Sequence, residues 1–146
     1  MPVNVVTETV IQKPRAAVAA FAADPANAPR WYVNIRSVEW RTPPPLVLGA
    51  RLDFVASFLG RRLAYTYDVT EWIPGERLVM RTAQGPFPME TTYTWDDAGE
   101  GATRMTLRNR GEPAGFSRWL APFMARAVAR ANRKDLARLK ALLEQG

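Results

Sequence analysis

Cysteine and histidine are both absent from this chain of 146 residues. Without cysteine there are no disulfide bonds, thiolate nucleophiles or thiolate metal ligands, and without histidine the commonest general base and the commonest metal ligand are missing. We therefore expect no metal site and no cofactor. Any chemistry has to use Asp, Glu, Tyr, Ser, Thr, Lys or Arg side chains.

Long hydrophobic runs are also absent. No stretch approaches the roughly 18 apolar residues that a membrane-spanning helix needs, and no basic segment followed by an apolar one precedes the first predicted strand. The hydrophobic share of 47% and the charged share of 23% are ordinary for a globular domain. We expect one soluble domain over residues 1–146, without a membrane span and located in the cytoplasm.

The charge of the chain is unbalanced toward the positive. Lys and Arg number 20 against 14 Asp and Glu, so the formal net charge is +6. Such an excess attracts nucleic acids and anionic membranes, but the basic residues are scattered and neither a glycine-rich phosphate loop nor a groove-reading motif accompanies them. The pattern favours a solvated basic surface and no specific nucleic-acid partner.

Residues 115–145 have the spacing of one long amphipathic helix, because their apolar residues recur at steps of three and four. The stripe consists of Phe116, Trp119, Leu120, Phe123, Met124, Ala127, Val128, Ala131, Leu136, Leu139, Leu142 and Leu143. It drifts around the helix axis, which predicts packing on a curved sheet rather than a coiled coil. Pro122 predicts a bend or a break. Stripe residues are core residues or, for Trp119, Phe123 and Met124, the lining of a cavity.

The rest of the chain has the pattern of strands and short helices. A strand is predicted over Val3 to Ile11, and Pro14 then begins a short helix over Arg15 to Ala23. Asp24 and Pro25 end that helix and start a further helical turn. Further strands are predicted over residues 35–41, 51–58, 62–72, 77–82, 89–95 and 103–110. Short connections rich in Gly and Pro make neighbouring strands antiparallel.

The faces predicted to be buried also carry hydrogen-bonding side chains, because residues of equal parity point to the same side of a strand. These side chains are Arg36, Tyr65, Tyr67, Thr91, Tyr93 and Asn109. Unpaired burial would cost about 1–3 kcal/mol each, so they pair with one another or face a wet cavity. The alternatives are tyrosine rings packed with their hydroxyls at the rim, and a strand bulge that turns Arg36 to solvent.

The order of these elements and several local motifs match a known family. The motifs are PRAAVAAF from Pro14, LGARLDF from Leu48, YTYDVTEWIPGERLVMRT from Tyr65 and GATRMTL from Gly101. Together with the long terminal helix they resemble the START-like or SRPBCC superfamily, and within it the polyketide cyclase/dehydrase and lipid-transport group. The resemblance implies an α+β helix-grip fold: a curved seven-stranded antiparallel sheet around a C-terminal helix, two short helices after the first strand, and a hydrophobic tunnel.

The resemblance implies a first function, the binding or transport of a lipid, polyketide or other ring-containing molecule in a cavity between the sheet and the C-terminal helix. Apolar side chains would supply buried area, and polar ones would orient substituents of the ligand. The expected ligand-binding residues are Arg36, Trp40, Phe54, Phe58, Tyr65, Tyr67, Met80, Thr91, Tyr93, Asn109, Trp119, Phe123 and Met124. We expect a monomer or a homodimer.

Two other functions remain open. A polyketide cyclase, aromatase or dehydratase would need a base beside a carbonyl and a donor for the enolate. Glu71 has the parity of the inward tyrosines, and Glu90 would need a bulge to face inward. The motifs carry no catalytic signature, so no catalytic residue is assigned. The third function is a protein-interaction module using the outer sheet and the basic helix, as the resemblance also implies.

Overall fold

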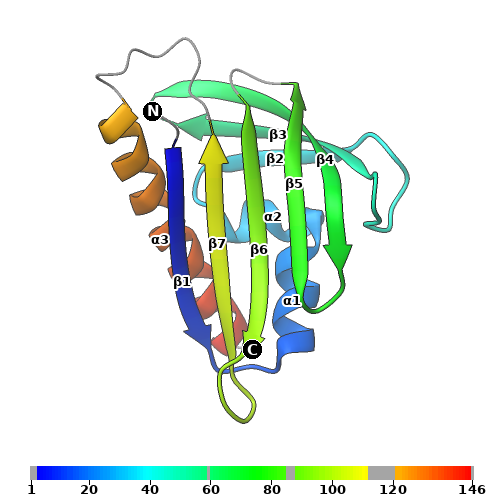
Figure 1. Ribbon diagram of the computed structural model, residues 1–146, viewed down its shortest axis with the longest axis vertical. Helices are drawn as coiled ribbons and strands as arrows, with labels where there is room; N and C mark the ends of the chain where they lie inside the picture. The colour runs from blue at the N-terminus through cyan, green and yellow to red at the C-terminus, as the bar shows by residue number, and fades with distance from the viewer. Residues whose placement is uncertain (1–2, 59, 85–87, 112–120, 146) are drawn as a thin grey trace.

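Seven antiparallel strands form one curved sheet, and the helices lie on one of its faces (Figure 1). The computed structural model describes residues 3–58, 60–84, 88–111 and 121–145. The strands are β1 (Val3–Ile11), β2 (Ile35–Trp40), β3 (Arg51–Phe58), β4 (Arg61–Ile73), β5 (Arg77–Gln84), β6 (Met89–Asp97) and β7 (Thr103–Gly111). The helices are α1 (Arg15–Ala23), the 3₁₀ turn η1 (Pro25–Asn27), α2 (Ala28–Trp31) and α3 (Ala121–Gln145).

The strand order is β1-β7-β6-β5-β4-β3-β2, so β2 to β7 form a meander and β1 closes its β7 edge. This is the predicted seven-stranded helix-grip arrangement. All seven predicted strands are confirmed, and their ends differ from the prediction by at most two residues. The alternation of apolar and polar residues was sufficient to predict the strands, because one face of the sheet is buried by helices.

Three register shifts interrupt the pairing of neighbouring strands: one lies between Thr66 and Tyr67 in the pairing of β4 with β5, and the other two place bulges in β2 and β4. The pairing of β2 with β3 shifts between Ile35 and Ser37, and the pairing of β4 with β5 shifts between Val69 and Glu71. Each bulge places one extra residue in its strand, so the side chains beyond it change faces relative to simple parity. These shifts decide where Arg36 and Glu71 point.

The corner between β1 and β2 is built from short helical pieces. Pro14 is the extended N-cap residue of α1, whose Val18, Ala19, Ala22 and Ala23 are buried. Asp24 then caps η1, because its Oδ1 accepts a hydrogen bond of 3.0 Å from the Ala26 backbone N–H. The chain continues into α2 and buries Trp31 completely. The predicted further helical turn is therefore confirmed.

Helix α3 runs beside β1 on the helical face of the sheet (Figure 1). Its end is tied to that strand, since Lys140 Nζ donates to the Val10 carbonyl at 2.6 Å and the Gln12 N–H donates to Glu144 at 2.9 Å. Pro122 is the second residue of α3 as described. The predicted helical segment before Ala121 lies outside the described residues, including Phe116, Trp119 and Leu120.

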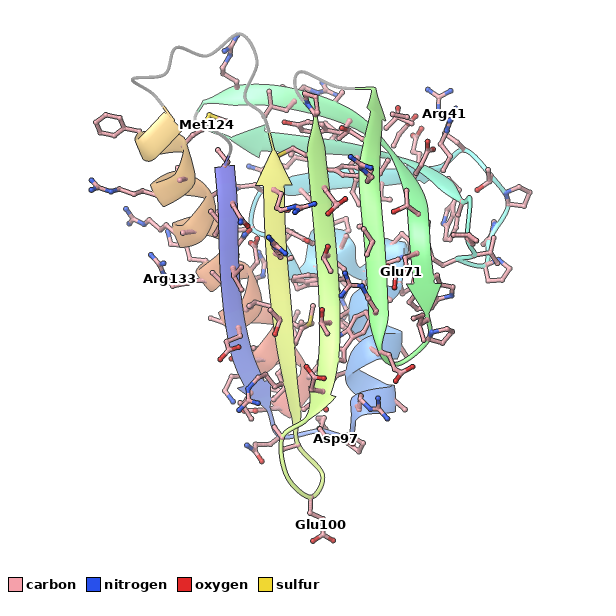
Figure 2. The ribbon with its side chains drawn as sticks, in the orientation of Figure 1. Arg41, Glu71, Asp97, Glu100, Met124 and Arg133 are labelled. Carbon is pink, nitrogen blue, oxygen red and sulfur yellow. The ribbon has the colours of Figure 1, made fainter. Side chains whose placement is uncertain are left out.

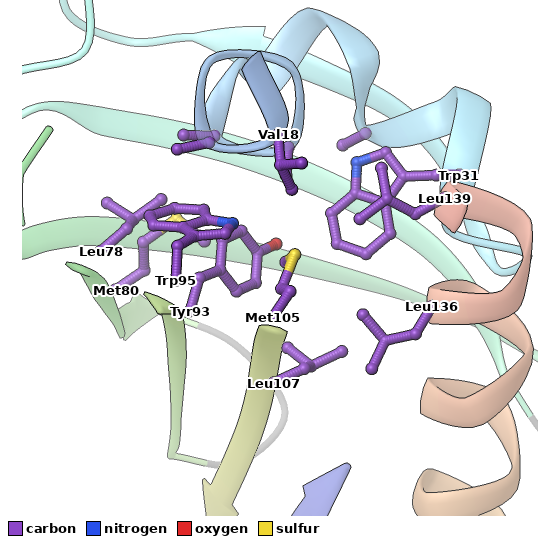
Figure 3. Packing of buried hydrophobic residues seen from close by; sticks show 14 of the residues in the cluster. Val18, Trp31, Leu78, Met80, Tyr93, Trp95, Met105, Leu107, Leu136 and Leu139 are labelled. Carbon is purple, nitrogen blue, oxygen red and sulfur yellow. The ribbon is translucent and has the colours of Figure 1, made fainter. Parts of the chain in front are cut away.

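The core fills the space between the sheet and the helices in two clusters. The larger one contains Trp31 of α2, Leu136 and Leu139 of α3, and strand residues such as Tyr93 and Trp95 (Figure 3). A small one joins Val3 and Val5 of β1 to Met124 of α3. Among the described helices, none is long and apolar enough to cross a membrane.

Candidate functional site

A cavity of about 150 Å³ lies between the sheet and α3 and is lined by members of both core clusters. The sheet contributes Ile35, Phe54, Ala56, Leu63, Tyr65, Tyr67, Met80, Met89, Thr91, Tyr93 and Asn109. The α2–β2 connection and α3 contribute Tyr32, Asn34, Met124, Val128, Ala131, Asn132 and Asp135. Most of this surface is apolar, and a few polar groups converge on it, which is the usual composition of a small-molecule site.

The structure brings most of the predicted site residues together at this cavity. The residues that line it are Phe54, Tyr65, Tyr67, Met80, Thr91, Tyr93, Asn109 and Met124. They come from α3 and from the five strands β3 to β7, because strand parity turns the same face of these strands toward α3. The side chain of Phe58 and all of Trp119 lie outside the described residues.

Three predicted site residues do not line the cavity. Arg36 is exposed, because the β2 bulge turns it to the outer face, where its Nε donates to Ser57 Oγ at 3.4 Å. Trp40 is half-buried and packs against the larger core cluster instead. Phe123 is 67% exposed, so the helix turns it away from the interior.

Two tyrosine hydroxyls meet at one side of the cavity. The Tyr32 and Tyr93 hydroxyl oxygens are 2.5 Å apart and share a hydrogen bond. The rings are held by Trp31, whose centroid lies 4.1 Å from that of Tyr32 and 5.7 Å from that of Tyr93. Burial, followed by the neighbouring phenol, raises the pKa of Tyr32 well above its ordinary value, so the hydroxyl keeps its proton. Sequence reasoning missed Tyr32, since its partner is 61 residues away.

A buried carboxyl group from α3 also faces the cavity. Asp135 is 2% exposed, and its Oδ1 accepts a hydrogen bond of 2.8 Å from the Val33 backbone N–H. Burial raises the pKa of Asp135 to about 7, while the Val33 hydrogen bond and the charge of Arg138 act in the opposite direction. Sequence reasoning missed this residue, although its spacing of one and four residues from Leu136 and Leu139 places it near the core face of the helix.

One helical turn before Asp135 lies Asn132, which also lines the cavity. Asn132 is 4% exposed, and its Nδ2 has no hydrogen-bond partner among the described residues. A buried amide donor without a partner costs about 1–3 kcal/mol. This donor is therefore available to a molecule that enters the cavity.

The polar residues of the strands are partly satisfied by one another. Thr91 Oγ1 donates to Asn109 Oδ1 at 2.6 Å. Burial raises the pKa of Tyr67, and its hydrogen bond with Thr91 offsets part of that effect. Burial also raises the pKa of Tyr65 to about 12. The sequence predicts that these polar side chains either pair with one another or face a cavity. Thr91 and Asn109 do both, because they share a hydrogen bond and also line the cavity.

The two carboxylates considered for catalysis face away from the cavity. Glu71 is 44% exposed and pairs with Arg77 at 3.2 Å, because the bulge in β4 reverses its expected side. Glu90 lies between Arg110, at 3.0 Å, and Arg81, at 3.4 Å. Both are surface ion pairs, so neither residue is a candidate base inside the cavity.

The excess positive charge lies outside the cavity. Among its described lining residues there is no Lys or Arg and one carboxylate, Asp135. Arg126, Arg130 and Lys134 line a separate surface hollow beside α3. Arg133 of the same helix points away from the sheet, whereas Met124 lies beside the strands (Figure 2). The described lining of the cavity thus lacks the positive charge that dominates the whole chain.

A curved antiparallel sheet that grips one long helix over an apolar cavity defines a helix-grip, START-like protein. The family model described as polyketide cyclase / dehydrase and lipid transport matches residues 2–144, and the chain belongs to this family. No match was found among curated proteins.

Solved structures share the fold at low sequence identity. A Thermus thermophilus protein has 22% identity and a TM-score of 0.81, with 94% of each chain covered. A START superfamily protein from Mycobacterium smegmatis has 13% identity and a TM-score of 0.83, with 97% of each covered. The Zhui aromatase/cyclase from a Streptomyces species has 16% identity and a TM-score of 0.80, with 99% of this chain and 95% of that chain covered. Identities this low show the fold alone.

Proposed function

We propose that this protein binds or carries a hydrophobic, ring-containing small molecule in the cavity between the sheet and α3. The observation that carries the proposal is a cavity of about 150 Å³ with a mostly apolar lining and a few buried polar groups. A cavity of roughly this size is known to accept a benzene ring. The family, whose description includes lipid transport, supports the same function.

The energy available to such a ligand is sufficient for binding. A molecule of two rings buries roughly 200–300 Å² of apolar surface, which contributes about 5–7 kcal/mol at about 25 cal/mol per Å². Each hydrogen bond to the polar groups adds about 1 kcal/mol. Ordering costs reduce this sum, so dissociation constants of about 10 µM to 1 mM are expected for simple ring compounds.

The first prediction is that filling the cavity abolishes binding. Ala131 lines the cavity from α3, so Ala131→Phe is expected to weaken naphthalene binding at least tenfold, measured by fluorescence titration. Ala137→Phe places the same ring at an exposed position of the same helix and is expected to leave the affinity unchanged. Native mass spectrometry of freshly expressed wild-type protein is expected to show a co-purifying small molecule that Ala131→Phe lacks.

The proposal is wrong if wild-type protein carries no small molecule and its melting temperature is unaffected by naphthalene and a wider set of hydrophobic ring compounds. It is equally wrong if both phenylalanine variants bind naphthalene as the wild type does. In that case binding takes place elsewhere on the protein.

A second candidate function, catalysis of a cyclase or dehydratase type, is favoured by Asp135. A buried carboxylate with a pKa of about 7 is suited to remove a proton from a carbon next to a carbonyl group. The C–H electron pair would form a C=C bond while the carbonyl π pair moves to the oxygen, and a hydroxyl of the Tyr32–Tyr93 pair would donate a hydrogen bond to the resulting enolate. The carboxyl would then return the proton.

The second prediction tests this base directly. With α-tetralone, a neutral bicyclic ketone, wild-type protein in D₂O is expected to accelerate exchange of the protons beside the carbonyl about 100-fold over Asp135→Asn, followed by NMR. Glu71→Gln, at a surface ion pair, is expected to match the wild type. Equal exchange rates in wild type and Asp135→Asn would exclude Asp135 as the base and leave ligand binding as the proposed function.

A further inference from the structure

Asn132 and Asp135 form the polar part of the cavity surface on α3. They are 4% and 2% exposed, and they lie one helical turn apart. Asp135 Oδ1 is occupied by the Val33 N–H, whereas Asn132 Nδ2 has no partner among the described residues. The cavity is therefore lined by the unpaired donor of Asn132 and by the Asp135 carboxyl group. One oxygen of that carboxyl group is not bonded to Val33.

The surroundings of Asp135 disfavour a second negative charge. From the other elements, the Val33 N–H and the neutral hydroxyls of Tyr32 and Tyr93 act on it. The cation that acts on it is Arg138, which is exposed on the same helix and does not line the cavity. A carboxylate or phosphate entering the cavity would thus meet a buried carboxyl group with no lining cation, and a buried unpaired charge is expensive.

We propose that Asn132 and Asp135 are specificity-determining residues that select a neutral ligand bearing a hydroxyl group and exclude ligands bearing a carboxylate or a phosphate. The hydroxyl oxygen accepts a hydrogen bond from Asn132 Nδ2, and its O–H donates to the Asp135 carboxyl. This inference rests on the proposed function and specifies the ligand of the same cavity.

A hydroxyl group fits because it is a donor and an acceptor in one atom. A carbonyl oxygen would satisfy Asn132 but would offer no proton to the ionised Asp135. A carboxylate would likewise accept from Asn132 while placing its charge beside that of Asp135. A hydrocarbon ring would leave the Asn132 donor unpaired, as it is without ligand.

Three probes that share one ring system test this selection: 2-naphthol, naphthalene and 2-naphthoate. At pH 8 a phenol is neutral and a carboxylate is ionised. Titration of wild-type protein is expected to give 2-naphthol an affinity at least tenfold above that of naphthalene and of 2-naphthoate, which corresponds to about 1.4 kcal/mol. At pH 5.5 the disadvantage of 2-naphthoate is expected to shrink severalfold, since Asp135 then carries a proton.

Two variants separate the two contacts. Asn132→Leu removes the donor and keeps the volume, so 2-naphthol is expected to fall to the affinity of naphthalene, which itself changes less than threefold. Asp135→Asn removes the charge while its amide oxygen can still accept from the Val33 N–H, so 2-naphthoate is expected to gain about tenfold at pH 8. Lys134→Leu, at an exposed position of the same helix, is the control and is expected to preserve the wild-type order.

The possible failures are distinguishable. If none of the three probes binds wild-type protein, the inference is wrong, and the proposed function is wrong too if the protein also carries no co-purifying small molecule and responds to no wider set of hydrophobic ring compounds. If naphthalene binds and 2-naphthoate binds as tightly as 2-naphthol, ligand binding stands and the selection is wrong. If wild-type protein prefers 2-naphthol but folded Asn132→Leu and Asp135→Asn keep the same order, other residues select the ligand and the assignment is overturned.

Discussion

Replacing Asp135 by Asn is expected to raise the free energy of unfolding by about 4 kcal/mol at pH 8 and by less than about 0.5 kcal/mol at pH 4. The effect is large because the carboxyl is 2% exposed and pays a desolvation penalty whenever it ionises in the folded protein. The folded-state pKa of about 7 is roughly three units above the ordinary value of 3.8. Each unit corresponds to about 1.4 kcal/mol.

The direction of the pH dependence follows from proton binding. Between about pH 4 and pH 7 the folded protein keeps the proton of Asp135, whereas the unfolded chain has lost it. Wild-type stability therefore falls as the pH rises through this window and levels off above pH 7. The Asn side chain has no proton to lose, so the difference between variant and wild type grows over the same window.

Urea denaturation at pH 4, 5.5, 7 and 8.5 measures this difference. Asp96→Asn is the matched control, because Asp96 is exposed at the end of β6 and its replacement is expected to change stability by less than about 0.5 kcal/mol at every pH. A difference between Asp135→Asn and wild type that stays constant with pH would contradict the buried, protonated carboxyl. A variant whose free energy of unfolding falls relative to that of wild type as the pH rises would contradict it as well.

Strand parity predicted the sheet side of the cavity correctly. Tyr67, Thr91 and Asn109 face α3 because a pleated strand turns every second side chain to the same face. The same rule failed for Arg36 and Glu71, since each is next to a bulge. A bulge depends on pairing with the neighbouring strand, so the residues of one strand do not reveal it.

The helix side of the cavity was predicted less completely for a different reason. The apolar stripe of α3 placed Met124 at the cavity, but only the apolar residues of that face were considered. Asn132 and Asp135 lie within the stripe at helical spacing, so the helical period contained the signal. The partner of the buried Asp135 carboxyl is the Val33 N–H, which donates a hydrogen bond to it, and this contact joins residues 102 positions apart.

Trp31, Tyr32 and Tyr93 form an aromatic cluster, with the Trp31 ring in contact with those of both tyrosines, and this cluster connects the core to the polar groups of the cavity. Trp31 of α2 is fully buried and lies beside Leu139 of α3 (Figure 3). Trp31→Ala is expected to lower the free energy of unfolding by about 3–5 kcal/mol, the range for deleting a buried large aromatic side chain. For a domain of this size, that is a fall of roughly 6–20 °C in melting temperature.

Trp31→Phe separates the ring from its N–H group. Trp31 Nε1 has no hydrogen-bond partner among the described residues, so Phe removes a buried unsatisfied donor while it keeps one aromatic ring. The loss of packed area and the relief of that donor offset each other, and we expect a cost below about 1.5 kcal/mol. Thermal denaturation of both variants, with Phe123→Ala as an exposed aromatic control, measures the contrast.

Besides lowering the stability of the whole domain, Trp31→Ala is expected to loosen the segment that borders the cavity. Loss of the Trp31 ring frees Tyr32 and the adjoining Val33, whose N–H holds the Asp135 carboxyl at 2.8 Å. Hydrogen exchange at the Val33 amide is therefore expected to accelerate in Trp31→Ala more than in Trp31→Phe. If Trp31→Phe destabilises as much as Trp31→Ala, the buried ring is not what supports this cluster, and if Val33 exchange is unchanged in both, the cluster does not position Asp135.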